Sequence, residues 1–131
     1  MTRRQEENRD SSSGGGAVGR AFEPVPEGDF HHRLAAAPGV AVVLFSGPHC
    51  NACRAWRQLL PAALAGVADS FHEVDVSEAT GIAHYYGIFH LPTIHLYRDG
   101  RFHAELQCVA QPDAIRDAAR RLLTEPAQEE P

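Results

Sequence analysis

The stretch VAVVLFSGPHCNAC, residues 40–53, decides the fold, because a buried strand leads into the start of a helix within it. Its first six residues lack polar alternation and are rich in β-branched side chains, which is typical of a central strand buried on both faces. The two cysteines, Cys50 and Cys53, follow directly and lie three residues apart. Behind them runs an apolar stripe at helical spacing, formed by Cys53, Trp56, Leu60 and Leu64. A C-x-x-C pair at a strand–helix junction indicates a redox or metal motif.

Outward from this stretch, strand and helix patterns alternate along the chain. We expect strands at residues 21–25, 40–45, 70–76, 93–97 and 102–108, and helices at 28–37, 50–66, 78–86 and 112–123. Asp99-Gly100 is a typical hairpin turn between the last two strands. Alternating strands and helices favour parallel pairing through right-handed crossovers, and the final hairpin adds an antiparallel edge.

Composition excludes several kinds of function. The 131 residues suit one domain, and the formal net charge of -5 argues against nucleic acid or anionic membrane as partners. All twelve basic residues are arginine, so Schiff-base chemistry at a lysine is excluded. The longest apolar run, Val40 to Phe45, is far too short to cross a bilayer.

The two ends of the chain differ from its middle. Residues 1–20 are polar and contain a Ser-Gly tract, which predicts a disordered tail. This segment lacks the apolar centre of an export signal, so we expect a cytoplasmic location and reduced thiols. The folded domain should span residues 21–124, and residues 125–131 should form a short acidic tail.

Further motifs make the chain similar to the thioredoxin family over residues 21–123. They are Tyr86-Gly87-Ile88, Leu91-Pro92-Thr93 and Tyr97-Arg98-Asp99-Gly100, which follow the C-N-A-C pair at the family's usual distance. The resemblance implies a thioredoxin-like α/β fold, with a central mixed, mostly parallel sheet and helices on both faces. It also implies a cis peptide bond before Pro92, whose loop would form the active-site wall together with His49, Leu91 and Thr93.

The two cysteines suit thiol–disulfide exchange. At the start of a helix, free N–H groups and the helix dipole favour the Cys50 thiolate and lower its pKa below about 8.5. We therefore expect Cys50 to attack a substrate disulfide. Cys53 lies one turn deeper on the same face, within reach of the resulting mixed disulfide.

Three departures from the family pattern stand out. The family's buried acid, six positions before the first cysteine, is replaced here by Leu44. His49 stands in place of the usual tryptophan, and Asn51-Ala52 replaces Gly-Pro. When protonated, His49 would stabilise the thiolate; the alternative is an exposed histidine without a role. Cys108 stands where the family commonly has glycine, either as a third thiol near the pair or as a small half-buried residue.

The sequence thus predicts a monomeric thiol–disulfide oxidoreductase that reduces protein disulfides through Cys50 and Cys53, without a cofactor or metal. Its electrons would come from a thioredoxin reductase-like protein or from glutathione. Two alternatives remain at this point. One is a non-catalytic module that binds clients through the Pro92 loop, and the other is a metal-binding protein that uses the C-x-x-C pair.

Overall fold

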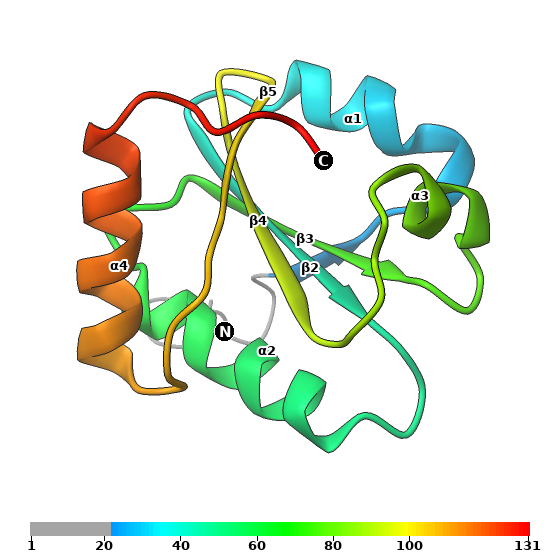
Figure 1. The fold of residues 1–131 in the computed structure, drawn as a ribbon, viewed down its shortest axis with the longest axis horizontal. Coiled ribbons are helices and arrows are strands. Elements are labelled where there is room, and N and C mark those ends of the chain that lie inside the picture. The colour runs from blue at the N-terminus through cyan, green and yellow to red at the C-terminus, as the bar shows by residue number, and fades with distance from the viewer. Residues whose placement is uncertain (1–21) are drawn as a thin grey trace, which may run out of the picture.

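The computed structural model describes residues 22–131, in which a five-stranded sheet lies between two pairs of helices (Figure 1). The elements are β1 (Phe22–Pro24), a 3-10 turn (Glu27–Asp29), α1 (Phe30–Ala36), β2 (Val40–Ser46), α2 (Asn51–Ala63), β3 (Ser70–Asp75), α3 (Thr80–Tyr85), β4 (Thr93–Arg98), β5 (Arg101–Glu105) and α4 (Pro112–Thr124). Each predicted element is present, with bounds that differ by a few residues. The tail predicted at residues 1–20 lies outside the described residues.

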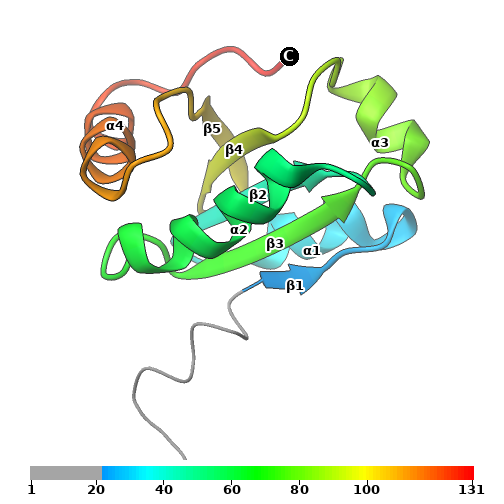
Figure 2. The same cartoon turned by 90° about the horizontal axis from the view of Figure 1, so that it is seen from below.

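Strand β2 is the centre of the sheet, whose strand order is β1-β3-β2-β4-β5. All seven of its residues are buried. Because side chains alternate along a strand, Val42 and Leu44 join the core against α2 and α4, whereas Val43 and Phe45 join the core against α1 and α3. Figure 2 shows α2 on one side of the sheet and α1 on the other. The predicted strand with two buried faces is therefore confirmed.

The sheet is mixed and carries helices on both faces, as predicted, but the expected parallel pairing of β4 is wrong. Strands β1 and β2 run parallel to β3, whereas β4 runs antiparallel to both β2 and β5. The connection explains the difference. Helix α3 has six residues and is only about 9 Å long, less than half the length of the preceding strand. Strand β4 therefore begins at the end of the sheet where β3 stops.

The antiparallel direction of β4 determines where the loop with the cysteines and the loop with Pro92 meet. The carboxyl ends of β2 and β3 and the amino end of β4 share one edge, so the loops after Ser46 and before Thr93 meet there. At the opposite edge, Asp99 and Gly100 have φ angles of 51° and 84°, which are the positive values of a tight hairpin turn. The predicted turn is confirmed.

The chain ends beside the sheet, past α4 (Figure 1). The Gln128 N–H donates to the His103 carbonyl at 2.7 Å, and the Gln128 side chain accepts from the Glu105 N–H at 3.0 Å. The Tyr86 hydroxyl donates to the Glu130 carboxylate at 3.2 Å. Across residues 22–131, no helix combines the length and apolar character needed to span a bilayer.

Candidate active site

Cys50 and Cys53 form a disulfide at the start of α2, with their Cα atoms 5.2 Å apart. Cys50 is the N-cap residue of the helix, in extended conformation, and its sulfur accepts the Cys53 N–H at 3.1 Å. Cys50 is half-buried, whereas Cys53 is fully buried. An incoming disulfide can therefore reach the first sulfur but not the second, which fits the predicted order of attack.

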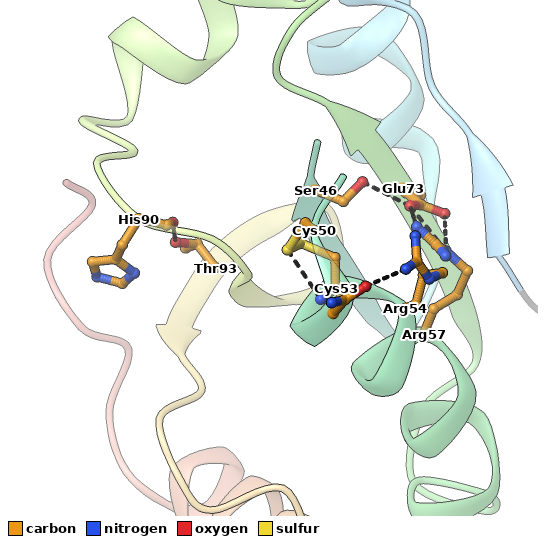
Figure 3. Close-up of a disulfide and its surroundings, with 9 residues drawn as sticks. Ser46, Cys50, Cys53, Arg54, Arg57, Glu73, His90 and Thr93 are labelled. Atoms are coloured by element: carbon orange, nitrogen blue, oxygen red, sulfur yellow. Dashed lines mark hydrogen bonds and ion pairs between the residues drawn. A yellow bond between two sulfur atoms is a disulfide. The ribbon is translucent and has the colours of Figure 1, made fainter. Parts of the chain in front are cut away.

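The Pro92 loop lies against the loop that carries Cys50. The Leu91–Pro92 peptide bond is cis, as the resemblance implied. A Cβ atom on Gly47 would lie 2.9 Å from Cδ1 of Leu91, so the absence of a side chain at Gly47 allows this close approach. The Thr93 hydroxyl donates to the His90 carbonyl at 2.7 Å and fixes the turn that precedes β4 (Figure 3). The structure thus brings together the two segments that the family resemblance implied as neighbours.

A charged cluster on the other side of the disulfide was not predicted. Glu73 of β3 accepts the Ser46 hydroxyl at 2.7 Å and both its carboxylate oxygens accept from Nε of Arg57, at 2.9 and 3.0 Å (Figure 3). The Glu73 side chain is only 19% exposed. The hydrogen bond from Arg57 to Glu73 raises the pKa of the guanidinium. The cluster ties α2 to the ends of β2 and β3, directly before the loop that leads to Cys50.

One feature of the sequence, a carboxylate within an interior strand, could have indicated this cluster. Glu73 sits between His72 and Val74, which are both buried, in a strand that pairs on both sides. A carboxylate in an interior strand requires a partner, because an unpaired charge is costly to bury. Arg57, four residues after Cys53, presents that partner from α2.

A cavity of about 550 Å³ opens between the charged cluster and Cys50. Its lining includes His49, which has a positive φ of 62° and an exposed side chain. His49 is thus placed beside Cys50 as expected, and its electrostatic role stays a prediction. Arg54, Asp75 and Glu78 also line the cavity.

Cys108 lies in the segment between β5 and α4, where it is half-buried against the core formed with α2 and α4. Burial raises the pKa of its thiol and so favours the neutral, less nucleophilic form. Its role as a third thiol stays a prediction. Nowhere in residues 22–131 do three or more His, Cys, Asp or Glu side chains form a group that could hold a metal ion.

Comparison with known proteins shows the family. The thioredoxin family model matches residues 22–121. The structure is similar to that of a mutant thioredoxin from Halobacterium salinarum NRC-1, with a TM-score of 0.66 and 20% identity, over 77% of this chain and 89% of that one. It is also similar to the human ERp44 zinc-bound form, with a TM-score of 0.63 and 21% identity, over 76% of this chain.

The chain spans only 30% of the length of that ERp44 structure, and at such low identity the likeness shows a shared fold. A search among curated proteins finds no match. The family model, in contrast, covers most of the chain and includes both cysteines and the Pro92 loop. With this match and the geometry of the site, the protein belongs to the thioredoxin family.

Proposed function

We propose that the protein reduces protein disulfides in the cytoplasm by dithiol–disulfide exchange. The observation that carries the proposal is the asymmetric cysteine pair, with Cys50 accessible at the N-cap of α2 and Cys53 fully buried behind it. The cytoplasmic location is itself part of the proposal. In that compartment thiols are kept reduced, which favours net reduction of the client.

The exchange proceeds in two steps. The Cys50 thiolate attacks one sulfur of the client disulfide, so that a mixed disulfide forms and the other client sulfur leaves as a thiolate that takes up a proton. Cys53 then loses its proton and attacks the Cys50 sulfur, which releases the second client thiol and closes the Cys50–Cys53 disulfide. The client gains two electrons, and the protein's dithiol loses them. A donor of two electrons, a thioredoxin reductase-like protein or glutathione, must reopen the disulfide.

In this proposal the surrounding groups have separate tasks. The free N–H groups at the start of α2 stabilise the thiolate, and the Cys53 N–H already points at the Cys50 sulfur. The Leu91 side chain lies against the loop that carries Cys50, and the backbone of this segment would pair with an extended client segment. Its position beside Cys50 would hold the client sulfur in line for attack.

The test is turbidimetric insulin reduction with dithiothreitol as the electron donor. Cys50→Ser should lower the rate to the uncatalysed level, because no thiolate is left for the first step. Cys53→Ser should accumulate a mixed disulfide with the client, which mass spectrometry of acid-trapped samples detects. Cys108→Ser is the matched control and should keep the rate within about twofold. A parent protein that does not accelerate the reaction, or a Cys50→Ser variant as active as the parent, would overturn the proposal.

One observation also favours a client-binding module. Phe89, three residues before Pro92, is 94% exposed, and a large aromatic side chain in this position is a ready contact for a partner. If binding alone were the function, Cys50→Ser would leave client affinity and cellular activity unchanged, whereas Phe89→Ala would weaken both. Loss of activity in Cys50→Ser with affinity preserved would instead favour the reductase.

A further inference from the structure

The cavity beside Cys50 is separate from the wall formed by the Pro92 loop. Its volume of about 550 Å³ lies within the range of small-ligand sites, about 300–1,000 Å³. Its lining comes from the end of β1, the loop before α2, the exposed face of α2 and the end of β3. Neither Leu91 nor Pro92 is part of it. A small molecule can therefore approach Cys50 from a side that an extended protein client does not use.

The cavity carries charges of opposite sign on different elements. Arg54 projects from the first turns of α2, and Asp75 and Glu78 come from the end of β3 and the residues after it. Figure 3 shows Arg54 beside Arg57 and Glu73, on the side of the disulfide away from His90 and Thr93. The guanidinium of Arg57 is already held by Glu73, whereas among the described residues the guanidinium of Arg54 donates only to the Asn51 side chain of its own helix.

We propose that this cavity binds a small zwitterionic thiol, one that carries both a carboxylate and an ammonium group, as the electron donor for the Cys50–Cys53 disulfide. The inference rests on the proposed function, since it names the donor of the same site. Arg54 would hold the carboxylate, because a guanidinium matches carboxylate geometry with paired hydrogen bonds. Asp75 and Glu78 would hold the ammonium group, and the thiol would reach Cys50 at the cavity's edge.

The donor reaction balances without another reactant. The thiolate of the first donor molecule attacks Cys50, a new S–S bond forms, and the Cys50–Cys53 bond breaks. Cys53 leaves as a thiolate and takes up the proton that the donor lost. A second donor thiolate attacks the donor sulfur of the mixed disulfide and releases Cys50 as a thiolate, which takes up the proton that the second donor lost. Two thiols become one small disulfide, and the protein gains two electrons and two protons.

The experiment measures the reduction of the oxidised full-length protein by glutathione, with free thiols trapped by alkylation and counted by mass spectrometry. The controls are N-acetylglutathione, which lacks the ammonium group, and 2-mercaptoethanol, which lacks both charges. Rates are compared per thiolate, which removes the difference in ionised fraction, and are corrected for the dependence of thiolate nucleophilicity on thiol pKa. Glutathione should show saturation and a rate constant about tenfold above that of 2-mercaptoethanol.

Variants test whether the faster reaction with glutathione arises from binding in the cavity. Arg54→Gln should lower the glutathione rate constant about fivefold and leave the 2-mercaptoethanol rate within twofold. Glu78→Gln should slow glutathione but not N-acetylglutathione, because only the former carries the ammonium group. Arg120→Gln, an exposed arginine on α4, is the matched control and should change neither rate.

Equal rates per thiolate for the three donors in the parent would overturn the inference, as would a glutathione preference that survives both Arg54→Gln and Glu78→Gln. Insulin reduction driven by dithiothreitol separates this failure from failure of the proposed function. If that activity is present without a glutathione preference, only the donor site is wrong. If insulin is not reduced at all, both conclusions are wrong.

Discussion

A buried histidine should make the fold sensitive to mild acid. His95 of β4 is only 1% exposed, and its ring packs between aromatic side chains, with centroids 4.9 Å from Phe45, 5.6 Å from Tyr86 and 5.0 Å from Phe102. Its Nδ1 atom is buried without a hydrogen-bond partner among the described residues. Burial lowers the pKa of His95 from 6.5 to about 4, because the protonated ring would be enclosed by apolar surface.

The linkage between protonation of His95 and folding gives the sign and size of the change in stability with pH. In the unfolded chain the ring takes up its proton near pH 6.5, whereas in the folded protein it stays neutral until about pH 4. The unfolded state therefore binds more protons between these values, and the free energy of unfolding falls as the pH is lowered through that window. From pH 7 to pH 4.5 the loss due to His95 is about 2 kcal/mol. Burial also lowers the pKa of His72, which acts in the same direction.

Urea unfolding at pH 7, 5.5 and 4.5, followed by tryptophan fluorescence, measures this loss. His95→Leu should be less dependent on pH than the parent, by about 2 kcal/mol over the full range. His32→Gln, which replaces an exposed histidine on α1, is the matched control and should keep the parent's pH dependence. If the parent and His95→Leu lose the same stability between pH 7 and pH 4.5, the argument from burial is wrong.

Two further variants, each with a matched control, test the backbone and the charged cluster. Gly100→Ala should cost at least about 2 kcal/mol, because φ is +84° and the new Cβ would lie 2.5 Å from the Ala35 carbonyl oxygen. Gly66→Ala, with a similar φ of +81° but open space around it, should cost about 1 kcal/mol, and equal losses would refute the steric part of the argument. Glu73→Ala should cost about 2 kcal/mol by denaturant unfolding, because it removes the acceptor of the arginine and serine contacts. Glu78→Ala, an exposed neighbour, should stay within about 0.5 kcal/mol, and a similarly small loss for Glu73→Ala would mean that the cluster is not stabilising.

Local patterns were enough to predict the elements. Residues 40–45 lack polar alternation because both faces of β2 are covered, and the Asp99-Gly100 turn needs two residues that tolerate positive φ. The direction of β4 could not be predicted from such patterns, since an alternating order suits parallel and antiparallel returns alike. It depends on how far the short α3 carries the chain, and that is a matter of geometry rather than composition.

The candidate site, too, was predictable from the sequence only in part. The sequence placed Cys50 at the start of the helix, and helix periodicity placed Cys53 on its apolar stripe; the structure shows Cys50 as the N-cap and Cys53 fully buried. The contact between Leu91 and the Gly47 loop was implied only by the family resemblance. The cluster around Glu73 was missed because its members come from three elements, and strand register and helix position together bring them into contact.

Register also explains why Leu44 and a charged site coexist. Leu44 and Glu73 are paired positions on adjacent parallel strands, so their side chains leave the same face of the sheet, the one that α2 covers. At Leu44 a carboxylate would be fully enclosed in the apolar core, where an isolated charge is costly. One strand further out, the carboxylate of Glu73 is reached by both Ser46 and Arg57 and keeps some contact with water. The charge near the cysteines therefore lies at the lining of the cavity rather than at Leu44 in the apolar core.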